Sequence, residues 1–235
     1  MKVAVLTGSS SGLGLAVYEH LLHQMDMLIC LARRFTDAQL SKAKQYSSSL
    51  KLIRLDLADT QNDKLWHTVE RSLRDVLSTK ILNEIIFINN AGVIEPIGRV
   101  GALDRSQVLS SVSVNLVSPI IIANYLAQIA REKGAKLKVV NISSGAANRP
   151  IAGWALYCSA KAGAKMFFDV MKETNDVEVC HVDPGVVDTN MQSIIRQKSK
   201  EEFPQVEYCI ALKNQKNLRN PNAAALEIIE KYILT

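Results

Sequence analysis

The sequence predicts one α/β domain, a single-domain Rossmann-like doubly wound parallel sheet with helices on both faces. Short apolar runs alternate with longer stretches in which apolar residues recur at helical spacing. A glycine-rich segment at 7–14 joins the first apolar run to the first helical stretch. Linkers, repeats and low-complexity tracts are absent from the 235 residues, so we expect a single domain spanning 1–235.

Six apolar runs have the length of strands buried on both faces of a parallel sheet. They lie at residues 2–7, 27–31, 50–55, 84–88, 138–142 and 177–182. Because a helical stretch follows most of them, right-handed βαβ units are expected throughout. The spacing of apolar residues predicts the order of strands and helices better than the residues at which they begin and end.

The helical stretches are expected between these strands and after the last one. They cover residues 13–24, 38–46, 65–77, 106–130, the segment around 153–163, and a closing helix at 221–234. We expect a bend near Pro119 in the long stretch and place Pro221 in the first turn of the last helix. Residues 191–216 look polar and irregular.

Composition restricts the classes of function. The formal charge is +5, but lysines and arginines are spread along the chain, which argues against nucleic acid and leaves a phosphate-bearing small ligand open. Apolar runs stay short of the ~20 residues that span a membrane, and the early glycine argues against a signal peptide. We therefore expect no nucleic-acid or membrane partner.

The four cysteines show no C-x-x-C pair, which favours thiols in a reducing compartment and a cytoplasmic location; they are Cys30, Cys158, Cys180 and Cys209. The histidines lack metal-ligand spacing, so no metal site is expected. The histidines are His20, His23, His67 and His181.

Tyr157 and Lys161 are the first candidate reactive pair. The residues around them favour a helix, on which a spacing of four places phenol and ammonium on one face. A cation beside a phenol lowers its pKa from about 10, which makes a proton donor and acceptor usable near neutral pH. The competing interpretation is an ordinary amphipathic helix.

The glycine-rich segment is the second candidate. Gly8, Gly12 and Gly14 allow a tight turn and a close approach of the backbone to a pyrophosphate at the positive end of a helix. The strand–turn–helix context favours a dinucleotide site over a purely structural turn.

Arg33 and Arg34 follow the second strand, where a doubly wound fold places the adenosine ribose. A carboxylate there would accept a hydrogen bond from the 2′-hydroxyl of the ribose, but residues 31–35 contain no Asp or Glu. A guanidinium group instead favours a ribose that carries a 2′-phosphate. We expect NADPH/NADP⁺ as the cofactor; the alternative is two solvated loop arginines.

Further motifs carry a resemblance to a known family. They are Asn-Asn-Ala-Gly at 89–92, Asn-Ile-Ser-Ser at 141–144, Tyr-Cys-Ser-Ala-Lys at 157–161 and Pro-Gly-Val-Val-Asp-Thr at 184–189. Together with the glycine turn, in this order from residue 2 to about 191, the chain resembles the short-chain dehydrogenase/reductase family.

The resemblance implies catalytic roles for Asn115, Ser144, Tyr157 and Lys161. Ser144 would hold a carbonyl oxygen and Tyr157 would protonate it, while Lys161 binds the nicotinamide ribose and Asn115 anchors a water. Cofactor contacts are implied for Gly8, Ser10, Ser11, Gly12, Leu13, Gly14, Arg33, Arg34, Asp56, Leu57, Asn89, Ala91, Gly92, Tyr157, Lys161, Pro184, Gly185, Val187 and Thr189.

Gly145-Ala146, Gly153-Trp154 and the segment 186–192 resemble the bacterial benzil reductases, a subgroup related to sepiapterin reductase. This implies NADPH-dependent reduction of one carbonyl of a small, aromatic or vicinal dicarbonyl. Alternatives are a pterin-carbonyl reductase, an alcohol dehydrogenase, and a non-catalytic NADP(H)-sensing module; such a module would be expected to have lost the tyrosine or the lysine.

The substrate pocket and the last strand are less well defined by sequence. Candidate pocket walls are Ile94, Pro96, Ala146, Trp154 and Val187, and the alternative for Trp154 is a place in the core. The resemblance implies a substrate lid at about 189–216, in which Met191, Ile194 and Ile195, at helical spacing, would close over an apolar substrate; the alternative is a plain surface helix. Members of the family usually end with a seventh strand. In this chain, either residues 232–234 are a remnant of that strand or the sheet ends at the sixth strand. A homodimer or homotetramer is implied by the resemblance.

Overall fold

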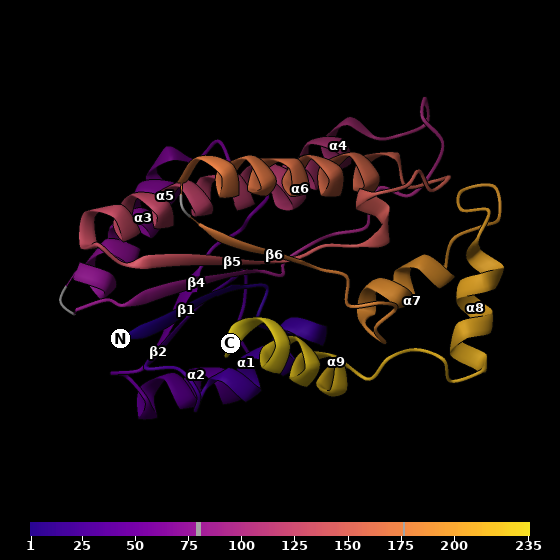
Figure 1. The fold of residues 1–235 in the computed structure, drawn as a ribbon. Helices are drawn as coiled ribbons and strands as arrows, with labels where there is room; N and C mark the ends of the chain where they lie inside the picture. Colours follow the sequence, from indigo (N-terminus) through magenta and orange to yellow (C-terminus); the bar gives the residue numbers. More distant parts are fainter. Residues whose placement is uncertain (79–80, 176) are drawn as a thin grey trace.

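A computed structural model describes residues 1–78, 81–175 and 177–235. Its centre is a six-stranded parallel sheet in the order β3-β2-β1-β4-β5-β6 (Figure 1). The strands are β1 (Lys2–Thr7), β2 (Met27–Ala32), β3 (Leu50–Arg54), β4 (Glu84–Asn89), β5 (Lys136–Ile142) and β6 (Glu178–Val182). All six predicted strands are confirmed, with ends that differ by at most two residues.

Helices cover both faces of the sheet, as predicted. In Figure 1, α3 (Asp63–Ser78), α4 (Arg105–Val112), α5 (Ser118–Lys133) and α6 (Ala155–Asn175) lie on one side. The other side carries α1 (Gly12–Leu21), α2 (Asp37–Gln45) and α9 (Pro221–Ile228). The helices α7 (Asn190–Arg196) and α8 (Val206–Asn214) lie beyond the carboxyl ends of the strands.

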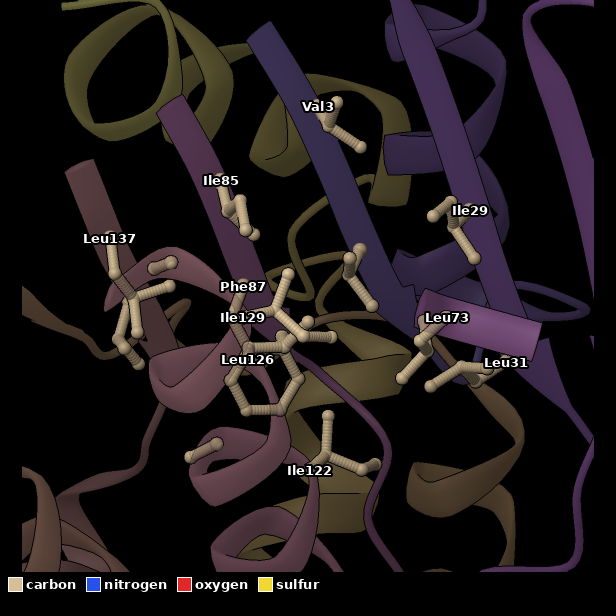
Figure 2. Packing of buried hydrophobic residues seen from close by; sticks show 14 of the residues in the cluster. Val3, Ile29, Leu31, Leu73, Ile85, Phe87, Ile122, Leu126, Ile129 and Leu137 are labelled. Atoms are coloured by element: carbon tan, nitrogen blue, oxygen red, sulfur yellow. The ribbon is translucent and has the colours of Figure 1, made fainter. Parts of the chain in front are cut away.

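Alternate residues of each strand fill the two cores. Val3 and Val5 of β1 belong to the cluster under α3, α5 and α6, whereas Ala4 and Leu6 belong to the cluster under α1 and α9. Figure 2 shows the first cluster, where Phe87 of β4 lies near Leu126 of α5. Burial on both faces explains why the strands read as continuous apolar runs.

The sheet order places a ligand site at a defined point. β1 pairs in parallel with both β2 and β4, so the chain reverses its direction of winding between β3 and β4. A crevice opens outside the carboxyl ends of the strands at such a switch point. The glycine turn after β1 and the Asn-Asn-Ala-Gly segment after β4 flank it.

The prediction that residues 191–216 are irregular was wrong. Two short helices, α7 and α8, form there and bury Ile195, Phe203, Val206 and Cys209 in a third apolar cluster. These helices are only seven and nine residues long, and the helical spacing of Met191, Ile194 and Ile195 is the one sign of α7 in the sequence.

The predicted bend near Pro119 has a different basis. A π-helical turn at Ser113–Val117 separates α4 from α5, and Pro119 lies in the first turn of α5. Because helical residues precede Pro119 without a break, the proline, which has no amide hydrogen, cannot donate to a carbonyl of the preceding turn. The wide turn therefore interrupts the helix just before the proline.

The sheet ends at β6 in the part of the chain that is described. Residues 229–233, which overlap the expected seventh-strand remnant at 232–234, instead form a π-helical turn after α9. Ile229 and Ile233 of this turn are buried in the cluster under α1. Of the two alternatives for the last strand, its absence is the one observed.

The helices at Arg105–Lys133 are long and apolar enough to cross a membrane by length and composition, with a mean hydropathy of 1.5. In this fold they lie on the sheet, and Ile122 and Leu126 are fully buried against it. A core helix of a soluble domain meets the same criterion.

Candidate active site

The turn after β1 is shaped for close backbone contact. Gly8 has φ 72°, and a Cβ on Gly14 would lie 2.1 Å from the carbonyl oxygen of Gly8. Only glycine fits at position 14, because any side chain would collide with backbone. The α1 helix begins at Gly12, so its N-terminus faces the crevice, as predicted for a site that binds pyrophosphate.

Polar side chains hold this turn in place. Thr7 Oγ1 accepts hydrogen bonds from the amides of Asn90 and Ala91, both at 3.1 Å, and Asn90 Nδ2 donates to the Thr7 carbonyl at 2.9 Å. Buried Gln39 donates from Nε2 to the Ser9 carbonyl at 2.9 Å. The sequence interpretation included Thr7 in the glycine-rich segment without giving it a role, and it missed Gln39, which only the fold brings to the turn.

A single cavity of about 620 Å³ contains most of the predicted site. That volume suits a small-molecule or cofactor site. Its lining includes the predicted residues Gly8, Ser10, Ser11, Gly12, Leu13, Gly14, Arg33, Arg34, Asp56, Leu57, Ala91, Gly92, Ser144, Tyr157, Lys161, Pro184, Gly185, Val187 and Thr189.

The two ends of the cavity differ in chemistry. Arg33 and Arg34 are exposed at one end, and within the described residues neither guanidinium has a hydrogen-bond or ion-pair partner. Across the middle, a Cβ on Gly12 would lie 3.0 Å from Thr189 Cγ2, so the glycine turn faces the segment after β6. Free cations, a glycine turn and a facing hydroxyl fit an elongated dinucleotide with phosphates.

Three reactive side chains meet at the other end. Ser144 follows β5, its Oγ accepts from the Ala146 amide at 3.1 Å, and it lies close enough to Tyr157 to lower the pKa of the phenol. Lys161 Nζ donates to the Ile142 carbonyl at 2.9 Å and lies 5.7 Å from the centre of the Tyr157 ring. Tyr157 and Lys161 are both buried, at 7% and 5% exposure.

The pKa of Tyr157 is raised, whereas the sequence analysis predicted that it would be lowered. Burial raises it from 10.0 to about 12; the Ser144 hydrogen bond lowers it, and the charge of Asp183 raises it further. Burial also lowers the pKa of Lys161 from 10.5 to about 8. The expected depression of the tyrosine pKa is absent in the protein alone, because desolvation of the phenolate is the largest influence on it.

Asn115 and Asn89 do not line the cavity. Asn115, in the π-helical turn, binds the Val93 backbone through both Oδ1 (3.0 Å) and Nδ2 (2.8 Å). It is close to the reactive cluster, since a Cβ on Gly92 would lie 3.1 Å from Asn115 Oδ1 and 3.8 Å from Lys161 Nζ. Asn89 donates to Asn141 Oδ1 across the sheet at 2.9 Å.

An aromatic wall closes the reactive end. Trp154 stacks on Phe203 with ring centroids 4.9 Å apart and an interplanar angle of 2°, and meets Tyr157 edge-on at 5.7 Å. Of the predicted walls and lid residues, all but Pro96 line the cavity: Ile94, Ala146, Trp154, Val187, Met191, Ile194 and Ile195. Phe203 was missed, because it lies in the segment read as irregular.

Three charged cavity residues were also missed, namely Glu95, Arg149 and Asp183. Arg149 and Asp183 flank Gly145, where an added Cβ would lie 3.9 Å from Arg149 Nε and 3.5 Å from Asp183 Oδ2. A signal for Asp183 was available, since it directly precedes the predicted Pro184 and Gly185. Arg149 carries no motif of its own.

The fold, the glycine turn and the Ser–Tyr–Lys cluster define a nicotinamide-dependent oxidoreductase, and the chain belongs to the short-chain dehydrogenase family. The family model described as "short chain dehydrogenase" matches residues 2–200. Oxidoreductases of this class act on CH–OH and C=O groups with a nicotinamide cofactor, and this chain is a carbonyl reductase of that type.

Individual relatives refine the comparison. The chain is 33% identical to a benzil reductase ((S)-benzoin forming) of Bacillus cereus, covering 97% of this chain and 92% of the relative. It is 31% identical to sepiapterin reductase of Rattus norvegicus, covering 85% and 79%. The crystal structure of the KRED1-Pglu enzyme matches in fold, with a TM-score of 0.81, 24% identity and coverage of 99% and 96%.

Proposed function

We propose that the protein is an NADPH-dependent reductase of one carbonyl in a small aromatic or vicinal dicarbonyl of the benzil type. The observation that carries the proposal is the Ser144–Tyr157–Lys161 cluster at the base of a cavity walled by the Trp154–Phe203 stack. The similarity to benzil reductases over nearly the whole chain supports the same substrate class.

The residues at the base of the cavity divide the chemistry between them. When bound, the nicotinamide cofactor supplies hydride to the carbonyl carbon. The hydroxyls of Ser144 and Tyr157 are close enough to hydrogen-bond each other, so both can donate to one carbonyl oxygen. Charge develops on that oxygen in the transition state, and donors aimed at it stabilise the transition state selectively.

Tyr157 is suited to act as the acid. With a pKa of about 12, its phenol carries its proton at neutral pH and can pass it to the developing alkoxide. Lys161, whose pKa is about 8, is largely protonated at pH 7 and places a positive charge beside the phenolate that remains.

Cofactor preference tests the adenosine end. We expect kcat/KM to be higher with NADPH than with NADH, because the free guanidinium groups of Arg33 and Arg34 would pair with a 2′-phosphate. Replacing both by alanine should lower kcat/KM for NADPH and leave that for NADH nearly unchanged. Equal or better efficiency of the unmodified enzyme with NADH would contradict the NADPH proposal.

The substrate class is tested by a screen of NADPH oxidation with benzil, 1-phenyl-1,2-propanedione, isatin, sepiapterin and simple ketones. The highest kcat/KM is expected with the aromatic dicarbonyls, because their rings match the aromatic wall. Preference for sepiapterin would favour the pterin-carbonyl alternative, which the 31% identity to sepiapterin reductase supports. Turnover of simple alcohols with NADP⁺ alone would favour an alcohol dehydrogenase.

The alternative of another class is a non-catalytic module that senses NADP(H). A sensing module would bind NADPH and turn over none of these substrates, although Ser144, Tyr157 and Lys161 are assembled here.

We infer a cytoplasmic location, because Cys30, Cys158, Cys180 and Cys209 are free thiols, as is usual in reducing compartments.

A further inference from the structure

The segment after β6 is held by a residue far along the chain. Arg219 lies between α8 and α9, and its amide donates to the Val186 carbonyl at 2.9 Å. Its own carbonyl accepts from the Asp188 amide, also at 2.9 Å. These two bonds form a single parallel bridge with Val187 between them. The backbone of Arg219 therefore aligns the segment that runs from Pro184 to Thr189.

The side chain of Arg219 holds the start of the same segment. Nη1 donates to the Pro184 carbonyl at 2.8 Å, and Nη2 forms an ion pair with Glu227 of α9. The arginine stem passes close under Gly185, where an added Cβ would lie 3.2 Å from Cδ. The planar, two-sided guanidinium can bridge a carbonyl and a carboxylate at once, which a lysine ammonium does less well.

This arrangement connects α9 to the reactive end of the cavity. Pro184, Gly185, Val187 and Thr189 all line the cavity opposite the glycine turn. Arg219 itself does not line it, so its contribution runs through the backbone of the segment. A second ion pair, from Lys213 of α8 to Asp188 at 2.6 Å, holds the far end of the segment on its outer side.

We propose that Arg219 is a positioning residue for the nicotinamide half of the cofactor, acting by fixing the backbone of residues 184–188. The proposal rests on the proposed function and on the cofactor contacts that the family resemblance implies for Pro184 and Thr189, both of which line the cavity. It goes beyond that function in assigning a task to a residue outside every motif. The adenosine half of the cofactor lies at the Arg33–Arg34 end and is independent of Arg219.

The test compares two ligands that share only the adenosine half. The dissociation constants of NADPH and of adenosine 2′,5′-bisphosphate are measured by calorimetry for the unmodified protein and for Arg219→Met. We expect the Kd of NADPH to rise about ten-fold, as for loss of a hydrogen bond from a charged group, and that of the bisphosphate to stay unchanged. Arg219→Lys, which can still reach the Pro184 carbonyl, should restore part of the affinity for NADPH.

Two controls separate positioning from a general loss of structure. Arg131→Met removes another exposed guanidinium, at the end of α5 and outside the cavity, and should alter neither constant. Arg33→Ala should weaken both ligands. An unchanged Kd of NADPH in Arg219→Met, or an equal rise for both ligands, would overturn the proposal.

The same titration distinguishes failure of the cofactor proposal. If the unmodified protein binds NADH more tightly than NADPH, the NADPH preference is wrong. The Arg219 comparison is then read from NADH and adenosine diphosphate, with the same split expected. If the protein binds neither dinucleotide, both proposals fail.

Discussion

Burial acts on the two central residues of the site in the direction that removes charge. It raises the pKa of Tyr157 to about 12 and lowers that of Lys161 to about 8. The spacing of four residues suggested that Lys161 would lower the pKa of Tyr157. The sequence does not show how strongly the fold excludes water from the phenol, and this exclusion raises its pKa. The result is a phenol that keeps its proton near neutral pH, which suits an acid.

Replacing Lys161 by methionine tests the burial of the ammonium. Its pKa falls from 10.5 to about 8 on folding, which corresponds to about 3 kcal/mol of destabilisation at pH 7. Between these two pH values the unfolded chain binds more protons than the native one, so this contribution to stability rises with pH. The variant should therefore be more stable than the unmodified protein at pH 7.

Denaturant unfolding across pH 6 to 10.5 measures this effect. The advantage of Lys161→Met should shrink steadily above pH 8 and be lost near pH 10.5. A stability difference that does not change with pH would contradict a buried, destabilised ammonium.

Replacing Tyr157 by phenylalanine tests the proton donor. The ring and its edge-on contact with Trp154 remain, while the hydroxyl is lost. We expect kcat to fall by about 10²- to 10⁴-fold, the usual contribution of a positioned acid, with the Kd of NADPH nearly unchanged. Steady-state rates with benzil give kcat, and a titration with NADPH gives its Kd. Substantial residual turnover by the variant would contradict the role of Tyr157 as the proton donor.

At the scale of elements, the segment between α7 and α8 contacts Gly153, which lies just before the helix α6 that carries Tyr157. This residue has φ 86°, and a Cβ there would lie 2.5 Å from the Glu202 carbonyl oxygen. Phe203, the next residue, stacks on Trp154. The segment between α7 and α8 can therefore reach the aromatic wall only while position 153 has no side chain.

Replacing Gly153 by alanine should displace this segment. The left-handed backbone and the contact with Glu202 together should cost about 1–3 kcal/mol of stability. The KM for benzil should rise with no change in the Kd of NADPH, because the cofactor half of the cavity is untouched. Gly134→Ala is the matched control: its φ is 62° and nothing lies within 4 Å, so stability should fall by about 1 kcal/mol without any change in KM.

The long elements were predictable from the sequence, and the short ones were not. Each strand is buried on both faces, so its apolar run stands out, and the glycine turn marks the first strand–helix junction. The helices α7 and α8 have only about two turns each, and their buried residues pack in one cluster with Phe203. The wide turn at Ser113–Val117 leaves no pattern in the residues that form it.

At the scale of the whole molecule, a single sheet brings together residues that are far apart in sequence. Tyr157 and Lys161 were predicted because they share one helix, and Ser144 because a family motif contains it. Gln39, Asp183 and Arg219 were not, since their contacts with residues 9, 145 and 184 depend on how the elements pack. The site is thus predictable where one element carries it and unpredictable where tertiary packing assembles it.

Assembly of the chain stays a prediction. We expect a homodimer or homotetramer, as the resemblance implies, and α6 presents Met166 and Val170 at 63% and 53% exposure. Size-exclusion chromatography with light scattering should give two or four times the chain mass of 25.9 kDa. A mass equal to one chain at micromolar concentration would contradict the expectation.

The central claim is that Tyr157 and Ser144 hold a dicarbonyl oxygen while hydride arrives from NADPH. Its most direct measurement is transfer of deuterium to benzil from NADPH that carries deuterium at both positions of the reactive nicotinamide carbon, followed by mass spectrometry of the product. The unmodified enzyme should yield benzoin with one deuterium on the carbinol carbon, and Tyr157→Phe should yield almost none. Unlabelled benzoin, no reduction of any dicarbonyl, or equal transfer by the variant would contradict the account.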